Sequence, residues 1–110
     1  MSFFWAWLRA FAFTQIIEVP IYRRALDGRT AVAFGASLVT HPIVWLASIP
    51  LSPRLGLWPY IALAELFAWL VEAGYMHLFG LKRALMWSAI ANGASFGLGT
   101  AAHYLFPGSL

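Results

Sequence analysis

Four long apolar stretches alternate with three short connections that are rich in arginine, lysine, proline and glycine. The apolar stretches cover residues 3–22, 30–51, 58–80 and 84–106. Each holds about 20 residues, the length at which an α-helix crosses the ~30 Å hydrocarbon core of a bilayer. Short connections place consecutive helices side by side and antiparallel. The pattern therefore predicts one all-α domain, a transmembrane four-helix antiparallel bundle.

The basic residues are distributed unevenly among the connections. The first and third connections share five cations: Arg23, Arg24, Arg29, Lys82 and Arg83. Arg54 is alone in the second connection, and Arg9 lies inside the first apolar stretch without an assigned role. Because cytoplasmic loops of membrane proteins carry an excess of lysine and arginine, the first and third connections are predicted to face the cytoplasm. Both termini would then be non-cytoplasmic.

Composition supports the membrane prediction and excludes several function classes. The chain is 62% hydrophobic and 10% charged, with a mean hydropathy of +0.75, which is outside the range of soluble domains. Its formal charge is +3, but seven lysines and arginines are too few for a basic nucleic-acid surface, so no nucleic-acid partner is expected. The absence of cysteine excludes disulfides and thiolate metal sites.

The acidic residues lie where a membrane helix should have none. Glu18, Glu65 and Glu72 are all inside apolar stretches, and only Asp27 lies in a connection. Glu65 and Glu72 are seven residues apart, close to two helical turns, so both point to one face roughly 10 Å apart along the axis. A carboxylate in lipid is costly, so this face is expected to meet protein, water or a cation.

The other helices offer polar residues at a similar depth. Counting from the basic ends of the helices places Glu18, His41, Glu72 and Asn92 near one layer, with one residue from each helix and Glu65 nearer the outer surface. The predicted supporting polar residues are Thr40, Ser88, Ser95 and Tyr75. Carboxylates together with an imidazole and an amide form a suitable seat for a proton or a hard cation.

Structural interpretations stand beside the functional ones. Glu72 and His41 would form either a proton relay or metal site, or a buried hydrogen-bonded pair that holds two helices in register. Glu65 would face water or pair with Arg54. Glu18 lies about one turn from Arg23 and Arg24, so an ion pair at the membrane surface is preferred for it over a place in the cluster. Which metal or cofactor, if any, would bind is left open by the sequence.

Small residues recur at four-residue spacing in the last stretch. The row is Ala89, Gly93, Gly97 and Ala101. Such rows allow close helix approach, so we expect a tight contact here, within the bundle or with a partner. The lipid bilayer and either a second copy of the chain or a larger membrane complex are the predicted partners.

The sequence gives little support to an enzymatic activity, because it lacks the common motifs of enzyme active sites. Glu-x-x-His, His-x-x-x-His and His-x-x-Glu-His are all absent, and so are nucleophile motifs and glycine-rich phosphate loops. A membrane-embedded lipid-modifying enzyme is a distant alternative, because it would need a cleft open to the bilayer beside His41 and Glu72.

Short signatures in all four stretches resemble a group of small, uncharacterised bacterial inner-membrane proteins with four spans. The signatures are Glu18-Val19-Pro20, then Thr40-His41-Pro42 with Trp45, then Glu65 and Glu72 with Tyr75, and finally Ala91-Asn92 with Ser95. The resemblance implies a multi-pass protein of the bacterial inner (plasma) membrane, and it implies no activity.

Two functions are consistent with these observations. The first is binding or translocation of a proton or small cation, with Glu72 as the principal carboxylate, His41 as its proton-exchanging partner and Asn92 as a neutral ligand. The second is a non-catalytic accessory or assembly subunit of a larger membrane complex, in which the same residues form a structural network. A solvated route from Glu65 to Glu72 would favour the first function.

Overall fold

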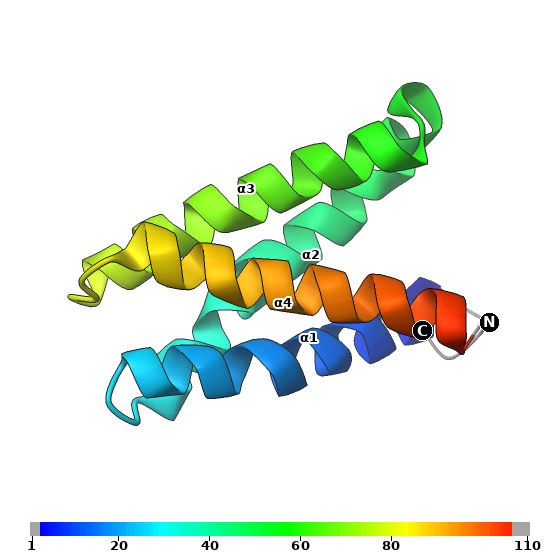
Figure 1. Cartoon of the computed structure of the whole chain (residues 1–110). Helices are drawn as coiled ribbons and strands as arrows, with labels where there is room; N and C mark the ends of the chain where they lie inside the picture. The colour runs from blue at the N-terminus through cyan, green and yellow to red at the C-terminus, as the bar shows by residue number, and fades with distance from the viewer. Residues whose placement is uncertain (1–2, 107–110) are drawn as a thin grey trace.

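The computed structural model describes residues 3–106 as four helices joined by tight turns (Figure 1). The helices are α1 (Phe3–Ala25), α2 (Thr30–Leu55), α3 (Leu57–Leu78) and α4 (Ala84–Leu105). No strand occurs in this part of the chain. The predicted all-α class is therefore confirmed, and the predicted helices lie within a few residues of the observed ones.

The helices form a closed ring in which each packs against two neighbours. α1 and α3 both contact α2 and α4. The α1–α2 and α3–α4 connections lie together at one end of the bundle, which we call the connection end (Figure 1). The start of α1 and the end of α4 lie at the opposite end, which we call the terminal end. Towards the terminal end, the α2–α3 turn diverges from the ends of α1 and α4. The α2–α3 pair therefore splays away from the α1–α4 pair towards this end (Figure 1).

The second connection is much shorter than the sequence predicts. Helix α2 continues through Pro50 and Pro53 to Leu55, and Gly56 alone separates it from α3. Proline fixes φ near −65°, a value that suits a helix, but neither proline can donate a hydrogen bond to the carbonyl four residues earlier, at Leu46 and Ile49. The reversal needs a positive φ, which Gly56 adopts at +88° without strain.

The connection end is closed by a well-packed core. Tyr22, Leu26 and Met76 are fully buried there. Alanines on three helices let the backbones approach around them: Ala33, Ala36, Ala73, Ala84 and Ala91. The Arg29 guanidinium donates a hydrogen bond of 3.0 Å to the carbonyl oxygen of Phe79, which ties the first connection to the end of α3.

The outer surface of the bundle is apolar. Large hydrophobic side chains are exposed along its helices, including Leu38, Ile43, Leu46, Leu63, Leu66, Leu70 and Ile90. Of the described helices, α2 and α3 are long and apolar enough to cross a membrane by length and composition. Crossing by all four helices stays a prediction, as do the multi-pass topology and the orientation of the termini.

The small-residue row of α4 faces outwards. Gly93 and Gly97 are exposed, and a side-chain carbon added at either would meet nothing within 4 Å. The predicted tight contact within the chain is therefore wrong. The reason is geometric: Ser88 and Asn92 lie one residue before Ala89 and Gly93, about 100° around the helix, and they face the interior.

Close approach of α2 and α3 instead depends on Gly35. The Tyr75 hydroxyl donates a hydrogen bond of 3.0 Å to the carbonyl oxygen of Val32 and lies directly against Gly35. An added methyl group at Gly35 would overlap the hydroxyl oxygen. The glycine therefore provides the space that the tyrosine needs.

We predict that Gly35→Ala destabilises the bundle by about 1–3 kcal/mol, because Tyr75 must move and lose its hydrogen bond. Thermal unfolding in detergent, followed by circular dichroism, measures the effect. Gly74→Ala is the matched control, since that glycine is helical and has open space around it. It should leave the melting temperature unchanged or raise it. Equal melting temperatures for the two variants would contradict the assigned contact.

Candidate functional site

A polar cavity of about 140 Å³ lies between the four helices. Every helix contributes polar side chains to its lining, which are Thr14, Glu18, Ser37, Thr40, His41, Glu65, Glu72, Asn92 and Ser95. At ~30 Å³ per molecule, the volume suits about four or five waters. The structure thus brings together all five residues predicted as the cation- or proton-binding set, from α1, α2, α3 and α4.

Glu72 is the most highly connected side chain of the cavity. Its carboxyl accepts hydrogen bonds from the Tyr22 hydroxyl at 2.8 Å, the Thr40 hydroxyl at 2.7 Å and the Asn92 amide nitrogen at 3.2 Å. These donors lie on α1, α2 and α4, so one carboxyl on α3 joins all four helices. Glu72 is 1% exposed. Three donors compensate for much of the solvation that the carboxyl loses on burial.

A second set of hydrogen bonds orients Asn92. Its amide nitrogen also lies 2.9 Å from the carbonyl oxygen of Ser88 and 3.2 Å from the Ser88 hydroxyl. The Ser88 hydroxyl donates to the carbonyl oxygen of Trp69 at 2.8 Å. Ser88 therefore acts as a support for Asn92 at the α3–α4 interface and does not line the cavity.

Glu18 is the second buried carboxyl. It is 2% exposed, and its Oε2 accepts a 2.6 Å hydrogen bond from the Ser95 hydroxyl. Its Oε1 is buried without a hydrogen-bond partner, and the carboxyl is close enough to Glu72 for their charges to interact. The predicted ion pair with Arg23 or Arg24 is wrong, since both arginines are exposed. They follow Glu18 by five and six residues and so point away from its face.

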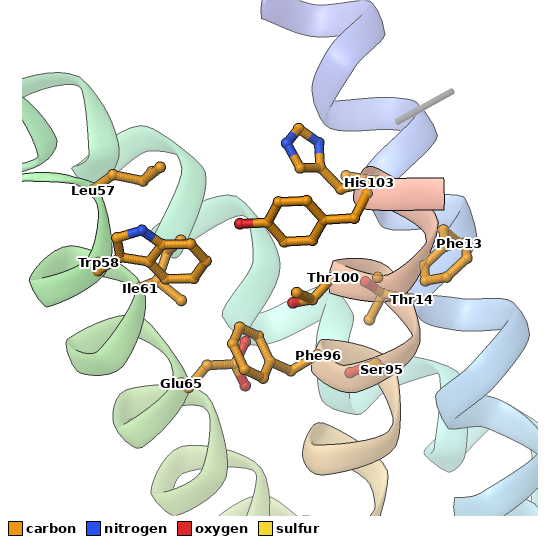
Figure 2. Close-up of a pocket in the computed structure, with 13 residues that line it drawn as sticks. Phe13, Thr14, Leu57, Trp58, Ile61, Glu65, Ser95, Phe96, Thr100 and His103 are labelled. Atoms are coloured by element: carbon orange, nitrogen blue, oxygen red, sulfur yellow. The ribbon is translucent and has the colours of Figure 1, made fainter. Parts of the chain in front are cut away.

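Glu65 lies where the polar cavity meets a larger cleft of about 500 Å³ (Figure 2). The cleft lies between α1, α3 and α4 at the terminal end, and Figure 2 shows Glu65 and Phe96 below Trp58 and His103. Among residues 3–106, no side chain donates a hydrogen bond to the Glu65 carboxyl. Arg54 is exposed and forms no ion pair with it. The water-facing interpretation of Glu65 agrees with this position.

His41 lines the cavity but does not pair with Glu72. Its ring lies against three aromatic rings, with centroid distances of 6.2 Å to Trp7, 5.4 Å to Phe11 and 6.0 Å to Trp45. Its Nε2 is buried without a hydrogen-bond partner. The predicted Glu72–His41 pair is therefore wrong. Consecutive helical residues point about 100° apart, so Thr40 reaches Glu72 while His41 turns towards α1.

The sequence prediction missed Thr14, Tyr22 and Ser37, and two predicted supporting residues, Ser88 and Tyr75, do not line the cavity. Tyr22 is a donor to Glu72, and the Ser37 hydroxyl is buried at the cavity without a partner. Helical spacing could have found both, because Tyr22 follows Glu18 by four residues and Ser37 precedes His41 by four. Tyr75, a predicted supporting residue, instead bonds the α2 backbone outside the cavity.

The histidine and acidic side chains of the cavity are not grouped as a three-ligand metal centre. In the part of the chain that the structure describes, no group of three or more histidine or acidic side chains is close enough to hold a metal ion. Glu72 and His41 both line the cavity between the helices. A membrane-embedded lipid-modifying enzyme stays a distant alternative.

Comparisons of the chain with protein-family models, curated proteins and solved structures found no match. The resemblance to four-span bacterial inner-membrane proteins therefore stays a prediction. The geometry and charge of the polar cavity are the features from which we infer a function.

The hydrogen bond from Tyr22 to Glu72 should stabilise the fold measurably. Tyr22→Phe removes one of two donors to the Glu72 Oε1 and is expected to cost about 1–2 kcal/mol, because a buried carboxyl loses a charge-assisted hydrogen bond. Thermal unfolding in detergent measures the loss. Tyr104→Phe is the matched control, since Tyr104 is 65% exposed on α4. If the melting curves of Tyr22→Phe and Tyr104→Phe are identical, the stabilising role of the Tyr22–Glu72 hydrogen bond is rejected.

Proposed function

We propose that this chain is a four-span membrane protein that binds a proton or small cation in its polar cavity and exchanges it with the outside through Glu65. The observation that carries the proposal is the presence of two buried carboxyls, Glu18 and Glu72, in one cavity without a neighbouring cation. Translocation is the extended form of this function, and it requires the connection end to open as well.

The distribution of polarity supports a location in the membrane. The buried positions include Gln15, Glu18 and Glu72, whereas the exposed ones carry large apolar side chains on all four helices. Contiguous apolar surface of this extent is unfavourable in water and favourable in lipid. The basic connections lie together at the connection end, so the positive-inside rule would orient that end towards the cytoplasm.

Charge balance supports a bound cation or proton. Within residues 3–106, neither lysine nor arginine lines the polar cavity, so ionisation of both Glu18 and Glu72 would leave two uncompensated negative charges in the interior. Isolated buried charges are strongly unfavourable, and like charges at close range add to the cost. A proton shared between the carboxyls, or a cation held between them, removes the imbalance.

Unpaired polar atoms offer further positions for a ligand or water. Glu18 Oε1, Ser37 Oγ and His41 Nε2 are buried without hydrogen-bond partners, and all three residues line the cavity. Buried polar groups usually find partners in protein or ordered water. Together with the Glu72 carboxyl, these atoms could complete the hydration shell of a small cation or carry a chain of waters.

Access to the cavity supports exchange at one side. Thr14, Glu65 and Ser95 line both the polar cavity and the cleft at the terminal end. Glu65 and Glu72 are two turns apart on α3, a separation that one or two water molecules can bridge. On the opposite side Tyr22 and Met76 are fully buried, so release towards the connection end would require these side chains to move.

The accessory-subunit function is favoured by one specific observation. The Glu72 carboxyl already has donors from three helices, as expected of a group that holds a scaffold together. The exposed row from Ala89 to Gly97 on α4 would then be available for a partner helix. In that case the cavity would hold waters but conduct nothing.

Proton and cation flux into liposomes containing the purified protein distinguishes the two functions. We expect flux in the wild type and at least a tenfold loss in Glu72→Gln, because the amide cannot exchange a proton or balance a cation's charge. The fold should survive, because the glutamine amide can donate to Thr40, whose hydroxyl can turn to the nearby Ala36 carbonyl oxygen.

Asp27→Asn is the matched control. It deletes a carboxylate from an exposed connection residue and should leave the flux at the wild-type level. Absence of flux in the wild type, combined with a changed melting temperature in Glu72→Gln alone, would reject exchange and favour the accessory subunit.

A further inference from the structure

The cleft at the terminal end is larger than a proton or a small ion requires. Its volume of about 500 Å³ lies within the ~300–1,000 Å³ that small-molecule sites occupy. Aromatic rings dominate its walls: Phe13, Trp58, Phe96 and Tyr104. A strongly hydrated ion gains little from such walls, whereas an organic molecule can bury its apolar surface against them.

A second opening leads to the same place from the side. A groove of about 550 Å³ between α3 and α4 shares Trp58, Ile61, Glu65 and Phe96 with the cleft. Its other lining residues are mostly apolar, including Leu66 and Trp69. Glu65 can therefore be reached both from the terminal end and from the outer face of the bundle, which is the lipid side in a membrane. This second path suits a ligand with an apolar body.

Glu65 is the acidic side chain of the cleft lining. Glu65 has no hydrogen-bond donor among residues 3–106, and neither lysine nor arginine lines the cleft. His103 is the one basic side chain of the lining, and Figure 2 shows it above Thr100 and far from Glu65. A cationic group beside Glu65 would therefore be attracted by an unpaired carboxylate in a partly dehydrated site, where charge pairing is stronger than in water.

We infer that the cleft binds an organic ammonium ion, with the positive charge beside Glu65 and the apolar body against the aromatic walls. Aromatic faces attract such cations through their quadrupoles, and Phe96 is the aromatic ring beside Glu65. Figure 2 shows the Phe96 ring next to Glu65 and the Trp58 ring above both, two turns earlier on α3. An anionic amphiphile is excluded by the same carboxylate, and a neutral one gains nothing from it.

This inference deepens the proposed function and rests on it for one point, the exchange of the ligand's charge against a proton in the polar cavity. Binding itself requires only Glu65 and the cleft. The two proposals can therefore fail separately, because one is measured as binding to the cleft and the other as flux dependent on Glu72.

The test is calorimetric titration of the protein in nanodiscs of zwitterionic lipid with benzyltrimethylammonium. Neopentylbenzene, in which carbon replaces the charged nitrogen, serves as the neutral isostere, with empty nanodiscs as the background. We expect Glu65→Gln to weaken binding of the cation about 10- to 100-fold. Trp58→Leu should weaken it about 3- to 10-fold through loss of aromatic surface against the apolar body of the ligand.

Asp27→Asn is again the control and should bind benzyltrimethylammonium as the wild type does. Circular dichroism and melting temperature establish that the Glu65 variant is folded, and the Trp58 variant provides an independent test if it is not. The inference is overturned if Glu65→Gln binds the cation within threefold of the wild type, or if neopentylbenzene binds as tightly as the cation. Flux without cation binding would leave the proposed function standing and reject this ligand class.

Discussion

The Glu72 carboxyl imposes the strictest constraint on this bundle, because a buried carboxyl requires hydrogen-bond donors that the rest of the structure must bring to it. Tyr22, Thr40 and Asn92 provide them from the three other helices. A shift of any helix by one residue would rotate its donor by about 100° and leave an oxygen of Glu72 unsatisfied. The network therefore sets the rotation of all four helices, and alanines at the contacts allow the approach that it requires.

This constraint divides the molecule into two parts. On the connection side of Glu72, Leu26 and Met76 close the interior by packing. On the terminal side, α3 and α4 separate, and the cleft reaches down to Glu65. Glu65 thus lies between a hydrogen-bonded layer and an open site, with an oxygen-rich cavity on one side and aromatic rings on the other. Ligand binding and charge exchange would occur at neighbouring positions along a single helix.

Helical spacing explains which predictions failed. Periodicity identifies the buried face of a helix to within about one residue, and Thr40 and His41 both lie near the centre of that face. The sequence cannot tell which of the two meets Glu72, because the answer depends on how far α2 is rotated against α3. The same ambiguity separates Ser88 from Ala89 on α4, where the polar row and the small-residue row are adjacent. In the structure Thr40 and Ser88 are the buried members of these two pairs.

The sequence by itself determined the four helices, the polar layer and the five residues predicted to bind a cation or proton there, because apolar length and carboxylates within apolar stretches are local properties of the chain. Only the tertiary structure decided the partners within that layer. Glu18 bonds Ser95 and not an arginine, and His41 packs against aromatic rings and not Glu72. The cleft beside Glu65 is likewise a tertiary feature, since it results from the divergence of α3 and α4, which no local pattern encodes.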